Sequence, residues 1–208
     1  MIEVLPAILE KSFGPIAEKV EKLKAAAPRA HLDLADGRFV PEAGWQEPER
    51  MRELGSEVKF DLHLMVEKPE QWIARWDFPN VFRMTFHQEA TYDTRRVLEL
   101  VRARGHEAGV ALKLDTSVSA IYDILEEVDL ALIMAVVPGA QGREFDARAL
   151  AKVGELRAHN PRVKIGVDGG VTPLVAGSLA QAGANVLVCG SYIWEQEDIK
   201  KAMESLRS

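Results

Sequence analysis

Cysteine is almost absent from this chain of 208 residues, and long hydrophobic runs and blocks of like charge are missing. The single cysteine, Cys189, excludes an internal disulfide and is typical of a reducing cytoplasm. The apolar runs are too short to cross a membrane, and the N-terminus shows no signal-peptide pattern. The net charge of −6 comes from interspersed acidic and basic residues, with no basic stripe. We therefore expect a cytoplasmic protein with no membrane or nucleic-acid partner.

Eight short apolar segments rich in β-forming residues alternate with segments of helical spacing. The expected strands are Val4–Leu9, Ala30–Leu34, Val58–Met65, Val81–His87, Ala108–Leu114, Leu130–Val137, Val163–Val167 and Asn185–Cys189. Clear helical patterns between them are Ile16–Leu23, Arg95–Arg104 and Thr172–Ala182. We expect eight helices in strict alternation with the eight strands.

This alternation predicts the fold class. Strands that alternate with helices are typical of parallel strands joined by helical crossovers, and eight units favour a closed (β/α)8 TIM barrel. An open doubly wound sheet is the alternative, but no Gly-x-Gly-x-x-Gly turn follows the first strand. The length is below the roughly 250 residues typical of such barrels. We therefore expect one α/β barrel domain over residues 1–208, with its functional groups at the carboxyl ends of the strands.

Imidazoles and carboxylates collect at those strand ends. His31 and Asp33 share one face of the second expected strand, because side chains two residues apart in a strand point the same way. Asp61 and His63 share a face of the third strand, and Asp168 follows the seventh. Two imidazoles and two carboxylates suit Zn²⁺, Fe²⁺, Mn²⁺ or Co²⁺ better than Ca²⁺ or Mg²⁺. The alternative for the first pair is a buried His–Asp hydrogen bond.

Three further polar residues at strand ends have other expected roles. Asp61 is a candidate for orienting a ligating imidazole. His87, at the end of the fourth strand, is expected to make a structural hydrogen bond. Lys113 could contact a substrate or form an ion pair at the mouth of the barrel.

Glycines cluster after the sixth, seventh and eighth expected strands. The residues concerned are Gly139, Gly142, Gly169, Gly170, Gly190 and the adjoining Ser191. Glycine lets backbone N–H groups approach an anion closely, and the loops after strands seven and eight of such barrels often bind phosphate. The alternative is three ordinary turns. Arg143 could add a cation to a phosphate site or be solvated.

Several motifs follow one another in a characteristic order. They are Pro6-Ala7-Ile8-Leu9, His31-x-Asp33-x-x-Asp36-Gly37, Asp61-x-His63-Leu64-Met65, Thr85-Phe86-His87-x-Glu89-Ala90, Met134-x-Val136-x-Pro138-Gly139, Val167-Asp168-Gly169-Gly170-Val171 and Gly190-Ser191. In order and spacing the chain resembles the ribulose-phosphate 3-epimerase family over nearly its whole length.

The resemblance implies a barrel of the ribulose-phosphate-binding type that interconverts D-ribulose 5-phosphate and D-xylulose 5-phosphate. It implies one divalent metal ion held by His31, Asp33, His63 and Asp168. Of these ligands, Asp33 and Asp168 would lie on opposite sides of the substrate and move the C3 proton through an enediolate. The phosphate would rest on Gly139, Gly142, Gly169, Gly170, Gly190 and Ser191, and Met65 and Met134 would pack against the sugar.

The resemblance also implies a homo-oligomer. Trp45, Trp72 and Trp76 are candidates for an interface, although core packing is expected for Trp72 and Trp76.

Departures from the family leave the substrate open. Ala7 replaces a serine that binds substrate in the family, and Ala35 replaces a pocket methionine, which predicts a roomier pocket. Ala140 and Gln141 stand where Phe-Gly is common. The alternatives are an epimerase for a ketohexose 6-phosphate such as allulose 6-phosphate, or a non-catalytic phosphosugar-binding barrel. A related decarboxylase or aldolase would need lysine in an Asp-x-Lys motif, and Ala35 occupies that position.

Overall fold

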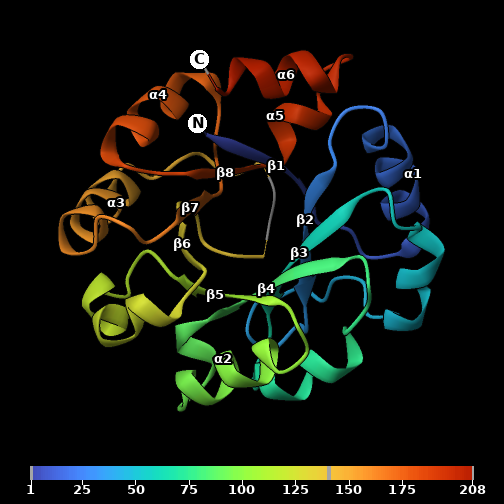
Figure 1. Ribbon diagram of the computed structural model, residues 1–208. Helices are drawn as coiled ribbons and strands as arrows, with labels where there is room; N and C mark the ends of the chain where they lie inside the picture. The colour runs from blue at the N-terminus through green and yellow to red at the C-terminus, as the bar shows by residue number, and fades with distance from the viewer. Residues whose placement is uncertain (1, 140–141, 208) are drawn as a thin grey trace.

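The computed structural model describes residues 2–139 and 142–207. In this part of the chain, eight parallel strands form a closed barrel in sequence order, and the last strand pairs with the first (Figure 1). The strands are β1 (Glu3–Ile8), β2 (Arg29–Ala35), β3 (Lys59–Met65), β4 (Val81–His87), β5 (Glu107–Leu112), β6 (Leu130–Met134), β7 (Ile165–Asp168) and β8 (Val186–Cys189). The predicted barrel is confirmed.

Helices surround the barrel in Figure 1. The α-helices are α1 (Phe13–Leu23), α2 (Thr94–Arg102), α3 (Arg148–His159), α4 (Pro173–Ala182), α5 (Ser191–Trp194) and α6 (Ile199–Ser205). In α1 the buried residues Phe13, Ile16, Val20 and Leu23 recur every three or four positions, which places them on one face against the sheet. The sequence predicted α1, α2 and α4 within a few residues of their observed bounds.

Each strand is followed by a helical segment, as expected, but not every crossover is α-helical. The crossovers after β2, β3 and β5 are 3₁₀-helical: η1 (Pro48–Leu54), η2 (Pro69–Gln71) with η3 (Ile73–Arg75), and η5 (Val118–Glu127). Another short turn, η4 (Gln88–Ala90), follows β4. A 3₁₀-helix rises about 2 Å per residue against about 1.5 Å for an α-helix, so it spans a given distance with fewer residues. This difference suits a barrel built from a short chain.

The interior of the barrel has a polar half and an apolar half. Side chains of β1, β5, β6 and β8 form an apolar cluster: Leu5, Ala7, Ala111, Leu130, Leu132, Met134, Val186 and Val188. Buried polar side chains come from β2, β3 and β4: His31, Asp33, Asp61, His63, Arg83, Thr85 and His87. The leucines that alternate with them, such as Leu32 and Leu62, pack in the larger core outside the barrel. Strands β2 to β4 therefore direct buried polar groups inward.

Trp45 lies in the core, so its interpretation as an exposed interface residue is wrong. Its side chain is 1% exposed, and its ring contacts the edge of Trp76 at 5.2 Å between centroids. The loop after β2 returns to the barrel, and the backbone N–H of Trp45 donates to the Glu10 carbonyl at 2.9 Å. Trp72 and Trp76 are buried as expected. The homo-oligomeric state stays a prediction.

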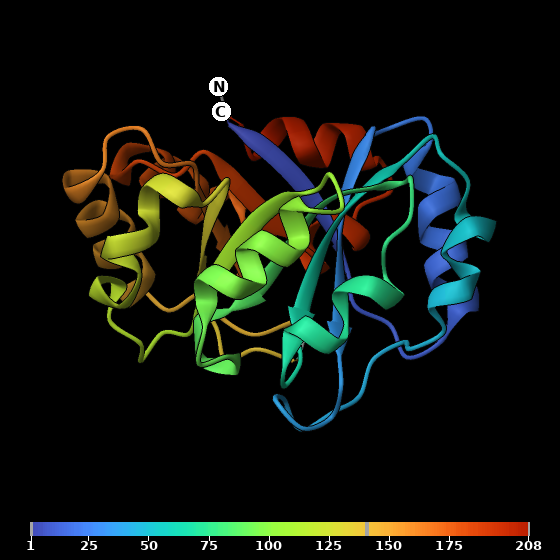
Figure 2. The same cartoon turned by 60° about the horizontal axis from the view of Figure 1, so that its bottom comes forward.

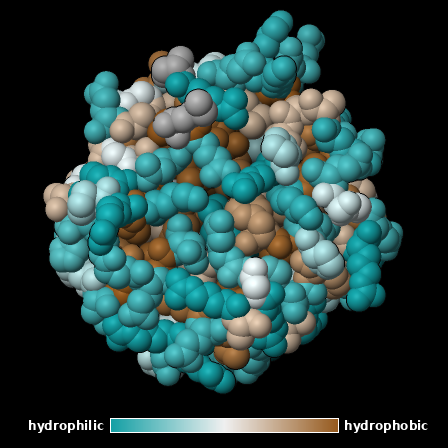
Figure 3. Space-filling model, in the orientation of Figure 1, coloured by the Kyte–Doolittle hydropathy of each residue, from teal (hydrophilic) through white to brown (hydrophobic). Residues whose placement is uncertain are grey.

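The two ends of the barrel differ in their loops. Figure 2 shows the blue loop after β2 extending beyond the lower rim, while β1 begins and α6 ends at the upper rim. The face in Figure 3 is mostly hydrophilic, and its apolar side chains lie in recesses between polar ones. Within the described ranges, no helix combines the length and apolarity needed to cross a bilayer.

Candidate metal centre and active site

The register of β2 and β3 creates two cross-strand His–Asp pairs. His31 lies opposite Asp61, and Asp33 lies opposite His63. Their side chains meet: His31 Nδ1 is 3.0 Å from Asp61 Oδ2, and His63 Nδ1 is 2.8 Å from Asp33 Oδ1. A shift of β3 by one residue against β2 would point Asp61 and His63 outward, so the register decides that the two pairs meet inside the barrel.

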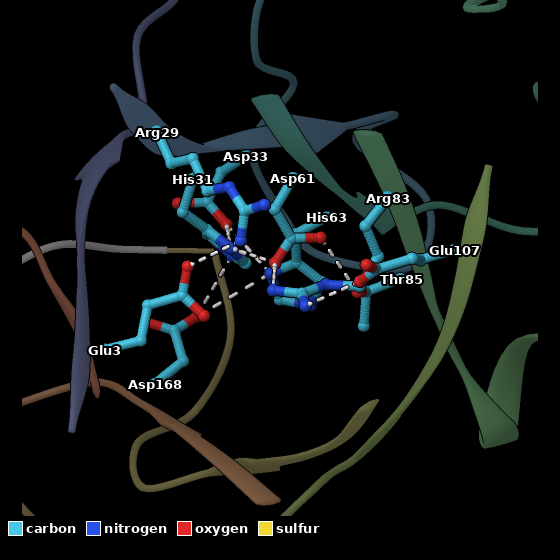
Figure 4. Close-up of polar contacts among 10 residues, drawn as sticks. All are labelled: Glu3, Arg29, His31, Asp33, Asp61, His63, Arg83, Thr85, Glu107 and Asp168. Carbon is cyan, nitrogen blue, oxygen red and sulfur yellow. Dashed lines mark hydrogen bonds and ion pairs between the residues drawn. The ribbon is translucent and has the colours of Figure 1, made fainter. Parts of the chain in front are cut away.

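Asp168, from β7, completes a group of four possible metal ligands with His31, Asp33 and His63 (Figure 4). One donor atom from each residue lies within 4.8 Å of the other three. Asp168 Oδ2 is 3.6 Å from His63 Nδ1 and 3.9 Å from His31 Nε2. The sequence predicted this set of four, and the fold brings all of them together.

The donor set fits a transition-metal cation. His31 Nε2 is fully buried and has no hydrogen-bond partner among the described residues, although an unpaired buried polar atom is costly. It points toward the Asp33 and Asp168 carboxylates, at 3.5 and 3.9 Å. Two nitrogen and two oxygen donors in a buried site suit Zn²⁺, Fe²⁺, Mn²⁺ or Co²⁺. A cation of this class would satisfy the free nitrogen lone pair.

A buried ion pair between Arg83 and Asp61 contacts the Nδ1 side of His31. Asp61 accepts hydrogen bonds from Arg83 Nη2 at 2.8 Å and from Thr85 Oγ1 at 3.0 Å, besides its contact with His31 (Figure 4). Burial alone would raise the pKa of Asp61, but attraction to Arg83 and His31 holds it well below its usual range. Gly109 leaves room for Thr85, because a Cβ there would lie 2.4 Å from Thr85 Oγ1. Asp61 therefore stands where a carboxylate orients a ligating imidazole, as the sequence indicated.

A different group supports His63. Its Nε2 lies 2.9 Å from Nε2 of His87, whose Nδ1 is 3.3 Å from Glu89 Oε2. Burial lowers the pKa of His87 to about 4, although the hydrogen bond with Glu89 acts in the opposite direction. The expected structural hydrogen bond of His87 is thus present, but its partner is a possible metal ligand. Glu89 belongs to the motif Thr85-Phe86-His87-x-Glu89-Ala90, but the sequence alone assigned it no role.

The pKa values of the two candidate catalytic carboxylates are shifted in opposite directions. Burial raises the pKa of Asp168, and repulsion by Asp33 raises it further, against the attraction of the two histidines. Burial acts in the same direction on Asp33, but its contacts with His31 and His63 outweigh burial and hold the pKa of Asp33 low. Neighbouring carboxyl groups whose pKa values diverge can serve as an acid and a base.

We expect Asp168→Asn to stabilise the metal-free protein at neutral pH. Folding raises the pKa of Asp168 from about 4 to about 6. The stability contributed by the protonated carboxyl group is therefore fully present below about pH 4 and is lost as the pH rises through about 6. Above that pH the ionised carboxylate repels Asp33, and asparagine removes this repulsion. Each kcal/mol gained should raise Tm by about 2–4 °C. Thermal unfolding in chelator from about pH 5 to about pH 8 measures the effect, and a lower Tm for the variant at the upper pH would contradict it.

A cavity opens beside the four ligand side chains at the carboxyl ends of the strands. Together with its mouth it encloses about 470 Å³, a size suited to a small ligand. Its lining residues are Ala7, Leu9, Asp33, Met65, Met134, Val136, Pro138, Gly139, Gly142, Arg143, Asp168, Gly169, Gly170, Gly190 and Ser191. All six phosphate candidates and three of the four pocket candidates therefore line one cavity with the two acids.

Ala35 is the pocket candidate that does not line this cavity. It is 1% exposed and packs with Val40 and Met65. The loop after β2 returns over it, and the Gly44 N–H donates to the Ala35 carbonyl at 3.0 Å. The roomier pocket expected at this position is not found there, because the chain's own loop fills the space.

The glycine loops after β6 and β7 are closely packed. Gly170 has φ +63°, and a Cβ there would lie 2.4 Å from the backbone nitrogen of Phe145. A Cβ at Gly169, which has φ +107°, would lie 2.4 Å from Cγ2 of Val136. Both the conformation and the space therefore require glycine at these two positions. Ala140 and Gln141 lie outside the described residues.

Lys113 and Arg143, the two cationic side chains with alternative expected roles, have different surroundings. Lys113 does not line the cavity: its Nζ lies 3.7 Å from the ring centroid of Phe39, and its backbone N–H donates to Glu89 Oε1 at 2.8 Å. Arg143 does line the cavity, and among the described lining residues it is the one with a cationic side chain. Cys189 is buried, and its Sγ donates to the Val171 carbonyl at 3.1 Å, as expected for a core residue.

Solved structures with similar folds come from several kinds of protein. A tryptophan synthase complex from Pyrococcus furiosus has a TM-score of 0.70 at 16% identity, covering 99% of this chain and 97% of that one. A 3-hexulose-6-phosphate synthase has a TM-score of 0.68 at 16% identity, with the same coverage. At this level of identity the similarity shows the barrel fold alone.

Sequence comparison is more specific. Residues 3–194 match the family described as ribulose-phosphate 3 epimerase. The chain is 34% identical over 215 residues to a ribulose-phosphate 3-epimerase of Bacillus subtilis, covering 100% of this chain and 99% of the relative. It is 32% identical over 212 residues to the one of Escherichia coli strain K12, covering 99% and 94%. The chain therefore belongs to the ribulose-phosphate 3-epimerase family, and it is an isomerase.

Proposed function

We propose that the protein epimerises D-ribulose 5-phosphate and D-xylulose 5-phosphate at C3, using one divalent metal ion and two carboxylates. The observation that carries the proposal is the position of Asp33 and Asp168: both belong to the ligand group and both line the cavity. Relatives named ribulose-phosphate 3-epimerase support the choice of a pentose phosphate.

His31, Asp33, His63 and Asp168 would hold the metal ion. A bound cation would supply Lewis-acid stabilisation of negative charge developing on the sugar oxygens. The chain itself fixes the two imidazoles, since His31 is backed by Asp61 and His63 by His87. Because the two imidazoles are already oriented, less conformational entropy is lost when the metal ion binds.

The two carboxylates would perform the proton transfers. A hydrogen on C3, next to the C2 carbonyl, is weakly acidic, and a positioned base contributes about 10²–10⁴-fold to its removal. Inversion requires a second group that returns a proton to the other face of the enediolate. Asp33 on β2 and Asp168 on β7 are separated by β1 and β8 around the barrel, so they reach the cavity from different sides.

The glycine loops would bind the phosphate. Gly139, Gly142, Gly169, Gly170, Gly190 and Ser191 line the part of the cavity formed by the loops after β6, β7 and β8. Backbone N–H groups at such turns suit anions, and a phosphate held there would orient the sugar toward Asp33 and Asp168.

Deuterium incorporation at C3 tests the proposed reaction. Protein supplied in turn with Fe²⁺, Zn²⁺, Mn²⁺ and Co²⁺ is incubated with ribulose 5-phosphate in D₂O, and exchange together with formation of xylulose 5-phosphate is expected. Allulose 6-phosphate in a parallel reaction tests a hexulose substrate. Faster exchange with the hexulose would replace the substrate assignment. Binding of both sugars without exchange would indicate a non-catalytic phosphosugar-binding barrel.

We expect Arg143→Gln to raise KM for ribulose 5-phosphate about tenfold with little change in kcat. Arg143 supplies the positive charge among the described cavity-lining residues, in a protein of net charge −6, and a charged hydrogen bond contributes about 1.5–3 kcal/mol. Steady-state kinetics measure the effect.

Arg162→Gln is the matched control for this charge. Arg162 forms an ion pair with Glu126 just before β7, at the end of the barrel away from the cavity. An equal rise in KM for both variants would show that net charge alone is responsible.

A further inference from the structure

The contact between two histidines behind the metal centre has a consequence for proton placement. His63 offers Nδ1 toward Asp33 and Asp168, at 2.8 and 3.6 Å, and its Nε2 lies 2.9 Å from His87 Nε2. Two imidazole nitrogens at this distance must share one proton, with one as donor and the other as acceptor. The direction of this hydrogen bond decides which nitrogen of His63 keeps a lone pair.

In His31, a carboxylate alone fixes which ring nitrogen keeps the lone pair. Its backing group is Asp61, a carboxylate that can only accept when ionised, so His31 Nδ1 donates and Nε2 is left with the lone pair. His63 is backed by an imidazole, which can either donate or accept. A further group is needed to set the direction, and Glu89 lies at the other nitrogen of His87, with Oε2 3.3 Å from Nδ1.

We propose that Glu89 and His87 are positioning residues that fix the tautomer of His63 for metal binding. The Glu89 carboxylate accepts the proton of His87 Nδ1, which leaves a lone pair on His87 Nε2. When a cation is bound, that nitrogen accepts from His63 Nε2–H, so the lone pair of His63 resides on Nδ1, which would otherwise donate to Asp33 Oδ1 at 2.8 Å. The inference rests on the metal site of the proposed function and is independent of the sugar.

The surroundings hold this relay in one arrangement. Glu89 is tied by its second oxygen, Oε1, which accepts the backbone N–H of Lys113 at 2.8 Å. His87 is fully buried between two rings, with its centroid 5.0 Å from that of His63 and 4.7 Å from that of Phe39. Buried side chains with packed faces keep one rotamer, so hydrogen-bond direction is the remaining freedom, and Glu89 removes it.

The tautomer can be observed directly. In the Zn²⁺-loaded protein labelled with ¹⁵N, two-bond ¹H–¹⁵N spectra should show His63 protonated at Nε2 and His87 protonated at Nδ1. A spectrum with His63 protonated at Nδ1, or with His87 protonated at Nε2, would overturn the proposal. This measurement needs no substitution, so it decides the question even where a variant fails to fold.

Metal affinity provides the second readout. His87→Met keeps a side chain of similar volume without an imidazole acceptor, and it should weaken Co²⁺ binding by about 10–100-fold in competition with a chelator. Glu89→Gln should weaken binding in the same range, because an amide can donate to His87 and reverse the relay. His87→Gln should restore most of the affinity, since its carbonyl can accept from His63 while its amide donates to Glu89.

Phe39→Leu is the matched control. It replaces the ring that packs on His87 by a smaller apolar side chain and removes none of the hydrogen bonds in the relay. The His63 tautomer should therefore be kept, and Co²⁺ affinity should fall much less than in His87→Met. A folded His87→Met protein with the affinity of the parent would refute the proposal, as would an equal loss in Phe39→Leu. Because Co²⁺ titration involves no sugar, a failure of the proposed epimerase activity would leave this result interpretable.

Discussion

Replacing either Asp33 or Asp168 by asparagine is expected to lower the epimerisation rate by about 10²–10⁴-fold, the usual contribution of a general acid or base. The two variants should retain proton exchange at C3 with different sugar epimers. With one carboxylate left, the hydrogen on C3 can still be exchanged in the sugar epimer whose hydrogen faces that carboxylate. Asp33→Asn and Asp168→Asn should therefore each exchange deuterium into one sugar, and these sugars should be opposite epimers.

Both residues are candidate ligands, so the metal content of each variant must be measured in the same samples. Asparagine keeps an oxygen donor at each position, and a variant that retains the metal isolates the proton transfer. Exchange into the same epimer by both variants would contradict the assignment of two carboxylates to two faces. Epimerisation near the parent rate by either variant would also contradict it.

Arg83→Met is expected to lower the free energy of unfolding by about 3–5 kcal/mol, since it leaves a buried carboxylate without its partner. Arg83 and Asp61 are both fully buried, and Arg83 Nη2 lies 2.8 Å from Asp61 Oδ2. Methionine fills a similar space but carries no charge. At about 2–4 °C per kcal/mol for a chain of this size, Tm should fall by roughly 6–20 °C.

The double variant Arg83→Met with Asp61→Asn is the control for this prediction. Asparagine removes the unpaired charge but retains an oxygen that accepts from His31, so much of the stability should return. Denaturant unfolding of the parent, both single variants and the double variant gives the coupling energy of the pair. A loss below about 1 kcal/mol in Arg83→Met would show that Arg83 does not neutralise Asp61 in the fold.

The metal ligands were predictable because two independent rules agree. Residues two apart in a strand share a face, and the carboxyl ends of parallel barrel strands meet at one rim. His31, Asp33, His63 and Asp168 follow from these rules once the strands are identified. The glycine loops follow in the same way. The supporting groups needed more than these rules: Arg83 occupies an inward position of an expected strand, but its partner depends on the register between β3 and β4.

Loop paths account for the predictions that were wrong. The sequence does not show that the loop after β2 folds back over the barrel, and that path buries Trp45 and places Gly44 against Ala35. Local periodicity also cannot separate a short α-helix from a 3₁₀ turn when the length of the crossover is set by the layer it spans. Contacts distant in sequence decide both outcomes.

The sequence by itself determined the alternation of strands and helices, the inward faces of β2, β3 and β7, and the residue types available for metal and phosphate. Only the tertiary structure decided which nitrogen of each histidine faces the metal centre, that His87 and Glu89 stand behind His63, and that Ala35 is covered. The physical reason is that side-chain direction along a strand is a local property of the backbone. Hydrogen-bond partners and loop packing instead depend on register and on contacts between residues far apart in the chain.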